Sequence, residues 1–242
     1  MATVIVDERM PSEGIRALEV LGHRVMTLPA LPSMPKAIAS HPDSLICKLE
    51  DTLVCSCALC DACPYVFTDL REYHPSLSLL FTSDEPGERY PLDAYFNALV
   101  IGDKLFVNTK NASQALLDKA REYGKKIIHT NQGYPACATL ALPTAHAVTA
   151  DPGLARALSE NGIKVLLIES DHISLPPYKY GFIGGACGVI GNTVYFFGDP
   201  ESHPDGARMK EFLSGAGYAV KSLFAGGLID LGGMTVIENS TK

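Results

Sequence analysis

The stretch YFNALVIGDKLFVNTKNASQALLDKAREYGKKIIHT, residues 95–130, contains one complete supersecondary unit. Two short apolar segments, Ala98–Ile101 and Lys104–Asn108, flank a Gly-Asp pair, which predicts a β-hairpin. A segment with apolar side chains at helical spacing follows and ends at Gly124, the residue type that commonly terminates a helix. The final KKIIHT predicts a third strand. This stretch therefore predicts the order strand, strand, helix, strand.

The same order recurs along the chain. Hairpin turns are expected near residues 50, 102, 143 and 191, which are between 41 and 52 residues apart. The other three hairpins are predicted in SLICKLEDTLVCS, CATLALPTAHAVTA and ACGVIGNTVYFFGD, and a helix and a strand follow each of them. The helix after the first of these is expected near residues 60–73, and LPALPSMPKA, residues 28–37, is expected to be a linker. A repeat of this length indicates a ring or an array of similar units.

The two ends of the chain supply parts of a fifth unit. The chain opens with a strand (ATVIVD), a helix (PSEGIRALEVLG) and a strand (HRVMTLP), but no hairpin partner is nearby. Pairing of Met234–Glu238 with Thr3–Asp7 would supply that partner. We therefore predict that residues 1–242 form a single α/β domain, a closed five-bladed ββαβ propeller. An open α/β sheet is the alternative, although it does not need a hairpin before every helix.

Four segments carry a resemblance to a known fold: HPDSLICK, QGYPACAT, DHISLP and YGFIGGACGVIG. With them the chain resembles the pentein family, the five-bladed α/β propellers of guanidine-modifying enzymes such as arginine deiminase and the amidinotransferases. The closest likeness is to an uncharacterised bacterial family of that fold. The resemblance covers essentially the whole chain. It implies an amidinotransferase-like cysteine enzyme, a hydrolase or transferase, although a non-catalytic ribosome-binding factor shares the fold.

In a ring of such units, the residues that lead into each inner strand converge on the central axis. The residues in these positions are His41, Asp43, Asn97, Cys137, Cys187 and Asp230. Attack on an amidine carbon needs a thiolate, a histidine for proton transfer and a carboxylate that holds the cation. The predicted cavity contains all three residue types.

His41-Pro-Asp43 matches the His-x-Asp pattern of the catalytic penteins. The resemblance implies that His41 transfers protons and that Asp43 helps to position the guanidinium. We expect Asn97 and Asp230 to contact the substrate as well. The simpler interpretation of His41-Pro-Asp43 is a turn in which Asp43 accepts hydrogen bonds from local backbone amides.

Two cysteines are candidates for the nucleophile. Cys187 lies in GGACG, where small residues let the backbone approach a ligand. Catalytic penteins usually carry the nucleophile near the C-terminus, two repeats beyond the histidine, but this chain has no cysteine after Cys187. Cys137 lies two repeats beyond His41 and would complete a rotated copy of the usual site. A nucleophile would be expected to be an unusually acidic thiol. Either cysteine could instead be a small buried apolar residue.

The segment ESDHISLPPYKY places further polar and aromatic residues beside the predicted cavity. Asp171 and His172 are candidates for substrate contact, although a histidine in such a loop is more often solvated. Tyr178 and Tyr180 are expected either to form a wall or lid of the cavity or to anchor the loop by packing. His146, within a predicted outer strand, is expected to be structural.

Composition and charge argue against several other classes of function. The net charge is −7 and the Lys and Arg residues are scattered, so nucleic acid is not expected as a partner. No apolar run approaches the length of a membrane span, and no secretion signal is visible, so a cytoplasmic protein is expected. No cofactor-binding motif is present, and no cofactor is predicted. The oligomeric state is left open.

A run of four cysteines is the most conspicuous local feature of the sequence. Its members are Cys55, Cys57, Cys60 and Cys63. The spacing faintly resembles an iron–sulfur motif. The repeat, however, places the run at the end of a hairpin strand and the start of a helix, away from the axis, so no metal is predicted there. The preferred function is a cysteine-dependent enzyme that acts on a guanidine or amidine small molecule; the alternative is a non-catalytic propeller that binds a small molecule or a protein.

Overall fold

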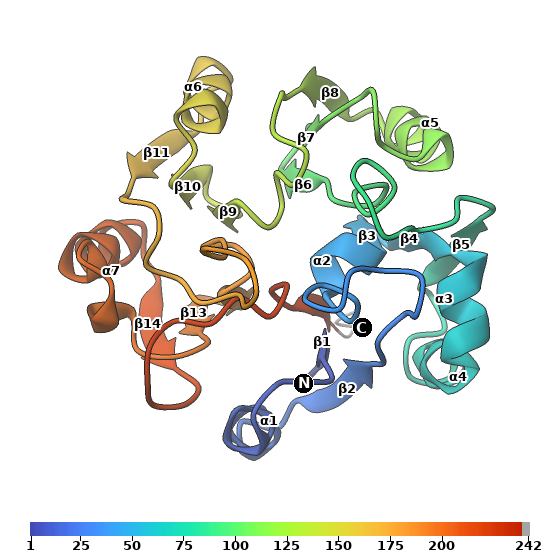
Figure 1. The fold of residues 1–242 in the computed structure, drawn as a ribbon, viewed down its shortest axis with the longest axis horizontal. Helices are drawn as coiled ribbons and strands as arrows, with labels where there is room; N and C mark the ends of the chain where they lie inside the picture. Colours follow the sequence, from blue (N-terminus) through green and yellow to red (C-terminus); the bar gives the residue numbers. More distant parts are fainter. Residues whose placement is uncertain (239–242) are drawn as a thin grey trace.

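Residues 1–238 are described by a computed structural model, in which five three-stranded sheets surround a central axis (Figure 1). We call each sheet with its helices a blade. Blade A contains β15 (Thr235–Glu238), β1 (Ala2–Asp7), β2 (Arg24–Leu28) and α1 (Ser12–Val20). Blade B contains β3 (Ile46–Leu49), β4 (Thr52–Ser56), β5 (Ser78–Thr82), α2 (Pro42–Leu45), α3 (Cys57–Ala62) and α4 (Pro64–Tyr73). Blade C contains β6 (Leu99–Ile101), β7 (Lys104–Val107), β8 (Lys126–His129) and α5 (Gln114–Glu122). Blade D contains β9 (Thr139–Leu142), β10 (His146–Thr149), β11 (Lys164–Leu167) and α6 (Pro152–Glu160). Blade E contains β12 (Cys187–Ile190), β13 (Thr193–Phe196), β14 (Ala219–Ser222), the short 3₁₀ helix η1 (Pro200–Ser202) and α7 (Gly206–Gly215).

All five blades share one topology. The inner strand is antiparallel to the middle strand, and the middle strand is parallel to the outer strand. A tight turn suffices for the antiparallel pair, whereas the parallel pair needs a crossover helix, which packs on the outside of the ring (Figure 1). Gly102 and Gly191 have positive φ in two of the hairpin turns, which explains why glycine occupies these positions. The strand, strand, helix, strand order predicted from the repeat is thereby confirmed.

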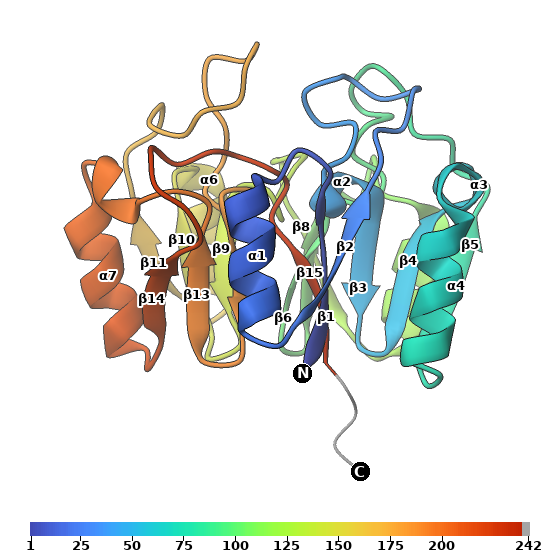
Figure 2. The same ribbon diagram turned by 90° about the horizontal axis from the view of Figure 1, so that it is seen from below.

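The two ends of the chain close the ring within blade A. Strand β15 lies beside β1 (Figure 2). The two strands are antiparallel, with Val236 opposite Val4 and Ile237 opposite Thr3. The pairing of the terminal segments is confirmed, but its register differs by one residue from the predicted one, and Met234 precedes the strand. The result is the closed five-bladed propeller expected from the sequence.

The hydrophobic core is divided into five clusters, and each cluster joins two neighbouring blades. Val4 and Val6 of blade A pack with Tyr195 of blade E, for example, while Ile5 packs with Leu53 of blade B. The remaining clusters join blades B and C, C and D, and D and E. Because every blade buries apolar side chains on both neighbours, the ring is held together all the way round.

Three local predictions need correction. The segment 28–37, predicted to be a linker, packs into the core through buried Leu31, Met34 and Ala37. The helix expected near residues 60–73 is two helices, because Pro64 begins a new one. Cys57 starts α3 and does not end the preceding strand. Across residues 1–238, none of the helices is long and apolar enough to cross a membrane.

Candidate functional site

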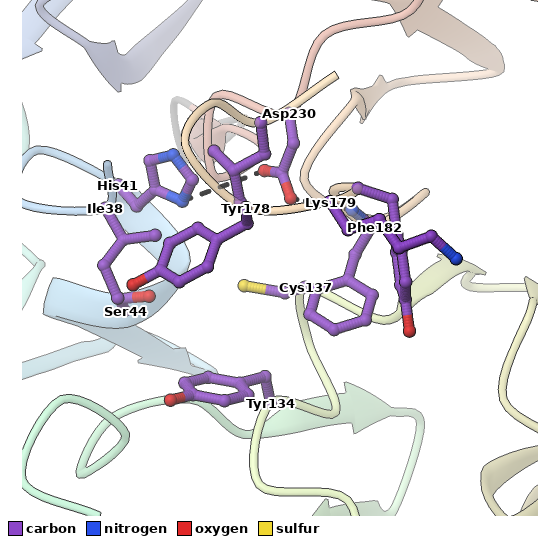
Figure 3. Close-up of a pocket in the computed structure, with 11 residues that line it drawn as sticks. Ile38, His41, Ser44, Tyr134, Cys137, Tyr178, Lys179, Phe182 and Asp230 are labelled. Atoms are coloured by element: carbon purple, nitrogen blue, oxygen red, sulfur yellow. Dashed lines mark hydrogen bonds and ion pairs between the residues drawn. The ribbon is translucent and has the colours of Figure 1, made fainter. Parts of the chain in front are cut away.

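A cavity of about 320 Å³ lies among the segments that lead into the inner strands of the blades (Figure 3). Its lining consists of Ile38, His41, Ser44, Tyr134, Cys137, Leu175, Tyr178, Lys179, Tyr180, Phe182 and Asp230. These residues come from parts of the chain that are far apart in sequence. The structure thus brings His41, Cys137 and Asp230 together, as the repeat predicts.

His41 precedes α2 and is fully buried. Its Nδ1 atom lies 3.8 Å from Asp230 Oδ1 and 4.0 Å from Asp43 Oδ1, and its Nε2 atom lies 3.8 Å from Asp7 Oδ2. Gly232 makes room for it, since a Cβ atom there would lie 2.4 Å from the His41 Cβ. Burial lowers the pKa of His41 to about 3, although the charge of Asp7 opposes this shift. The imidazole is therefore neutral at neutral pH, and burial makes it a weaker base than a solvated histidine.

Two acidic residues lie beside His41. Burial raises the pKa of Asp43, and the charge of Asp230 raises it further. Burial also raises the pKa of Asp230, although its carboxylate accepts hydrogen bonds from the backbone N–H groups of Phe182 (2.8 Å) and Gly232 (3.0 Å), which oppose the shift. Removing negative charge from water is costly, so a cation that binds between these carboxyls would be stabilised.

Cys137 is buried in blade D, just before β9, and its sulfur points into the cavity (Figure 3). Asn97 donates a hydrogen bond from Nδ2 to the sulfur (3.1 Å), and its Oδ1 accepts one from the backbone N–H of Ala136 (2.8 Å). Asn97 therefore holds the thiol and does not line the cavity. Burial raises the pKa of Cys137, and the charges of Asp43 and Asp230 add to the shift. This shift is opposite in direction to the lowered pKa expected of a nucleophilic thiol.

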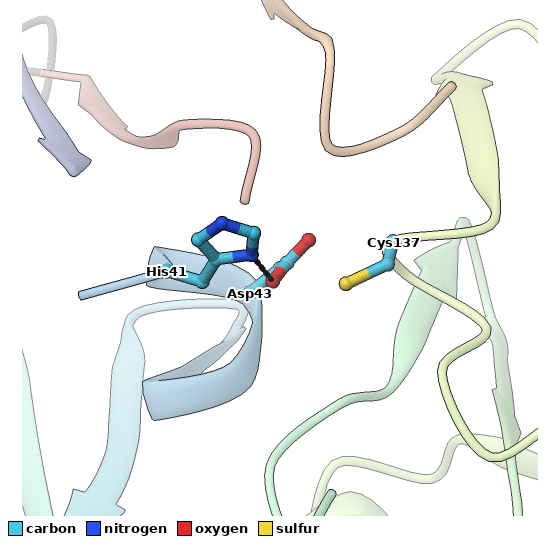
Figure 4. A group of neighbouring side chains, drawn as sticks. All are labelled: His41, Asp43 and Cys137. Atoms are coloured by element: carbon cyan, nitrogen blue, oxygen red, sulfur yellow. Dashed lines mark ion pairs between the residues drawn. The ribbon is translucent and has the colours of Figure 1, made fainter. Parts of the chain in front are cut away.

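His41, Asp43 and Cys137 form a compact group at one side of the cavity. One nitrogen, oxygen or sulfur atom from each residue lies within 4.8 Å of those of the other two. Asp43 lies between the imidazole and the sulfur (Figure 4). A thiol, an acid and a neutral imidazole at this spacing can exchange protons through one bridging water molecule, through a bound ligand, or after small side-chain movements.

Cys187 does not belong to this group. Its thiol donates a hydrogen bond to the Ile183 carbonyl oxygen (3.1 Å) and packs in the core between blades D and E. It borders a different cavity of about 250 Å³, whose lining also includes Asp43. Burial raises the pKa of Cys187. Of the two cysteine candidates, the geometry favours Cys137.

The predicted contacts at Asp171 and His172 lie outside the cavity lining. The Asp171 carboxylate pairs with Lys179, which does line the cavity, so Asp171 can act on a ligand only through that lysine. His172 pairs with Glu169 (3.4 Å) and its ring packs against that of His203. Tyr178 and Tyr180 form part of the cavity wall, one of the two roles expected for them.

His146 is placed as a structural residue. Its Nδ1 atom lies 2.8 Å from the Thr144 carbonyl oxygen, and its ring packs on Phe212 with 5.5 Å between ring centroids. It takes no part in the cavity lining.

Asp7 and Arg9 were not predicted from the sequence as residues near the site. Asp7 ends β1, is fully buried, and accepts hydrogen bonds from Arg9 Nε (2.9 Å) and Nη2 (2.6 Å). The Asp7 carboxylate, held by Arg9, thus lies beside Nε2 of His41. An acidic residue directly after the mostly apolar run ATVIV was the available signal, because such an acid commonly lies at the edge of a site.

The cysteine run lies in blade B, away from the central axis, as expected. Cys57 is exposed, Cys60 is half-buried, and Cys55 and Cys63 are buried. Among residues 1–238, the group formed by His41, Asp43 and Cys137 is the only set of three or more His, Cys, Asp or Glu residues close enough to bind one ion. The run does not meet that geometry. All of the cysteines are free thiols.

Comparison with known proteins identifies a family and a fold. A model described as "Family of unknown function (DUF6873)" matches residues 5–235. No curated protein matches the chain.

Solved structures with the same architecture are known. Dimethylarginine dimethylaminohydrolase is 10% identical, with a TM-score of 0.57 and 90% of each chain covered. An amidinotransferase of the saxitoxin pathway from Microseira wollei is 10% identical, with a TM-score of 0.59, covering 99% of this chain and 95% of the other. An agmatine deiminase from C. jejuni is 7% identical, with a TM-score of 0.58 and coverages of 99% and 94%. The architecture of this chain is therefore the pentein fold.

Proposed function

The chain belongs to the DUF6873 family of unknown function, and we propose that it is a cysteine-dependent enzyme acting on a guanidine or amidine small molecule. One observation carries the proposal: Cys137, His41 and Asp43 meet within 4.8 Å of one another beside a cavity of about 320 Å³. The solved structures that share the fold include a dimethylarginine dimethylaminohydrolase, an agmatine deiminase and an amidinotransferase, which supports the same reaction class.

The cavity suits a flat cation. Asp230 in the lining and Asp43, which lies beside His41 and borders the neighbouring cavity, supply negative charge on one side, and a planar guanidinium can form paired hydrogen bonds with a carboxylate. Aromatic rings of Tyr134 and Phe182 lie on the opposite side, 6.5 Å apart between centroids. Aromatic faces attract cations, so the wall and the acids favour the same ligand charge.

The reaction would begin with formation of the thiolate. The pKa of Cys137 is raised in the free protein, and a bound cation would neutralise the carboxyl charges that contribute to the shift. The thiol proton passes to the neutral His41, and Asn97 donates a hydrogen bond to the sulfur. Cation binding and thiol activation would thereby be coupled.

The thiolate then attacks the central carbon of the ligand, forming a C–S bond. His41 gives its proton to a departing nitrogen, the C–N bond breaks, and ammonia or an amine leaves. In the hydrolytic version, a water molecule forms the new C–O bond with His41 accepting its proton; the C–S bond breaks, and a urea-type product and the thiol result. In a transferase, an amine would replace the water.

Two isosteric reagents test this proposal. 2-Chloroacetamidine is cationic and 2-chloroacetamide is neutral, and both alkylate a thiol with loss of chloride. A charged hydrogen bond contributes about 1.5–3 kcal/mol, so we expect Cys137 to react at least about ten-fold faster with the amidine than with the amide. Exposed Cys57 in the same chain serves as the reference thiol. Peptide mass spectrometry measures the rate at each cysteine.

Single substitutions provide the controls. Asp230→Asn is expected to reduce the preference for the amidine, because it removes one of the charges beside His41. Cys187→Ser should leave the preference unchanged, since its sulfur lies outside the cavity. Equal rates for the two reagents at Cys137, after correction by Cys57, would contradict cation-directed catalysis.

A non-catalytic propeller is the second candidate. The raised pKa values of Cys137 and Cys187 favour it, because neither thiol is activated in the free protein. The alkylation experiment separates the two functions, since a purely structural thiol would show no preference for a cationic reagent.

A further inference from the structure

The His41, Asp43 and Cys137 group contains polar atoms that the protein leaves without partners. Neither ring nitrogen of His41 forms a hydrogen bond, and Oδ2 of Asp43 has no donor with suitable geometry. His41 is fully buried. A buried polar group without a hydrogen-bond partner costs about 1–3 kcal/mol of stability, so such atoms usually bind a water molecule, an ion or a ligand.

The donor atoms of the group are those that a borderline-soft divalent metal prefers. A thiolate sulfur, an imidazole nitrogen and a carboxylate oxygen are the three ligand types found in zinc sites. Asp230 adds an oxygen 3.8 Å from His41 Nδ1, although two backbone N–H groups already hydrogen-bond to it. A zinc site with three protein ligands and a fourth position beside a cavity can exchange its fourth ligand.

We propose that His41 Nδ1, Asp43 and Cys137 Sγ bind a zinc ion, with Asp230 or a water molecule as the fourth ligand. Zinc–ligand bonds of about 2.0–2.3 Å place neighbouring ligand atoms about 3.3–3.8 Å apart. The donor atoms of the group lie within 4.8 Å of one another, so side-chain movements of about 1 Å or less would close the site. Formation of the Zn–S bond displaces the thiol proton to solvent, and the two anionic ligands then balance the charge of the ion.

Zinc and a guanidinium would compete for the same place. Both are attracted by the buried acids, and a zinc-bound sulfur cannot attack a carbon atom. Zinc binding would therefore hold the protein in an unreactive state. Binding of the ion does not require that the protein catalyse the proposed reaction.

Cobalt spectroscopy tests the site without any guanidine compound. Co²⁺ is added to metal-free, full-length protein under anaerobic conditions. We expect one Co²⁺ per chain, with a thiolate-to-cobalt band in the near ultraviolet that disappears when Zn²⁺ is added. Cys137→Ser should abolish the band, and His41→Gln should weaken Co²⁺ binding at least about ten-fold.

Exposed Cys57 and half-buried Cys60 of the cysteine run supply the matched control. A Cys57→Ser/Cys60→Ser double variant should keep the full cobalt signal, and so should Cys187→Ser. Loss of the band in the double variant, its persistence in Cys137→Ser, or binding well below one ion per chain would overturn the proposal.

A second measurement uses the unaltered chain and so does not depend on how the variants fold. Stoichiometric Zn²⁺ should slow alkylation of Cys137 by iodoacetamide at least about ten-fold while leaving that of Cys57 unchanged. Equal protection of both thiols, or none, would count against the site. Because failure here involves no amidine, it is distinguishable from failure of the proposed reaction.

Discussion

At the scale of single residues, the glycines of YGFIGGACG create space for Asp230. A Cβ atom on Gly185 would lie 1.9 Å from Asp230 Oδ1, and one on Gly181 would lie 2.4 Å from Asp230 Cβ. The sequence suggested that the glycines of GGACG, which include Gly185, let the backbone approach a ligand. In the structure, Gly181 and Gly185 leave the space that Asp230 occupies beside the cavity, and neither glycine lines the cavity itself.

Gly185→Ala is therefore expected to displace Asp230 and to destabilise the protein. Overpacking of this kind costs about 1–3 kcal/mol, and loss of the hydrogen bonds to Asp230 adds to it. Urea denaturation should show a lower free energy of unfolding by about 2–4 kcal/mol.

Gly215→Ala is the matched control for Gly185→Ala. Gly215 ends α7, nothing lies within 4 Å of its added Cβ atom, and alanine favours a helix by up to about 1 kcal/mol. The substitution should be neutral or slightly stabilising. A loss of stability in Gly215→Ala as large as that in Gly185→Ala would show that the close contact with Asp230 is not the cause.

The sequence predicted most of the site's residues but not their roles. His41, Cys137 and Asp230 could be placed together because the repeat positions each beside an inner strand. The choice between Cys137 and Cys187 could not be made, because both precede or begin an inner strand. The direction of each sulfur depends on packing between blades, and a local sequence pattern does not predict such packing.

At the scale of elements, Asp205 connects two neighbouring blades. Its Oδ2 accepts a hydrogen bond from the backbone N–H of Glu169 (2.7 Å), just after β11, and its Oδ1 pairs with Arg208 on α7. These contacts lower the pKa of Asp205 below its usual value, the bond from Glu169 being the largest cause. The ionised carboxylate therefore stabilises the contact between blades D and E.

Asp205→Asn tests this link through its pH dependence. A carboxyl with a lowered pKa in the folded state stabilises the protein above the pKa of the unfolded state, about 3.9, and loses this effect as the pH falls through the folded value. The variant should be less stable than the unaltered protein by about 1 kcal/mol at pH 7, since a neutral hydrogen bond replaces a charged one. The difference should shrink below about pH 4. Urea denaturation from pH 3 to 7 measures it, and a difference that stays constant over this range would exclude a role for the charge.

Helices and hairpins were predicted well because their signals are local. Turn residues and apolar periodicity indicated every hairpin and outer helix, although the break at Pro64 was missed. The segment before β12 was expected beside the cavity, and its Tyr178 and Tyr180 do line it. Lys179 was not singled out, because its place in the lining depends on a loop in which Ser174 bridges to Ile229, and a contact between segments so far apart leaves no local signal.

At the scale of the whole molecule, the ring depends on a pairing between the two ends of the chain. The repeat indicated this closure because blade A lacked one strand, yet the register was predicted one residue away from that observed. Alternation along β1 could not fix the register, because all of its residues are buried. Met234, just before β15, also packs against Gly188, where a Cβ atom would lie 1.9 Å from the Met234 side chain.

Removing residues 234–242 should therefore open the ring. The truncated chain loses β15 and the packing at Gly188, and it exposes the edge of β1, which can pair with another chain. We expect a broad, low-temperature unfolding transition in calorimetry and concentration-dependent association in sedimentation.

A circular permutant separates the role of strand pairing from that of chain length. A short Gly-Ser linker joins Lys242 to Met1, and new ends are made between Gly191 and Asn192, in the turn that connects β12 to β13. Blade E is then closed by strand pairing alone, as blade A is in the natural chain. The permutant should remain monomeric at concentrations where the truncated chain associates, and it should unfold in one cooperative transition. If the truncated chain unfolds as cooperatively and at the same temperature as the natural one, closure by β15 does not hold the ring together, and the clusters between the other blades must suffice.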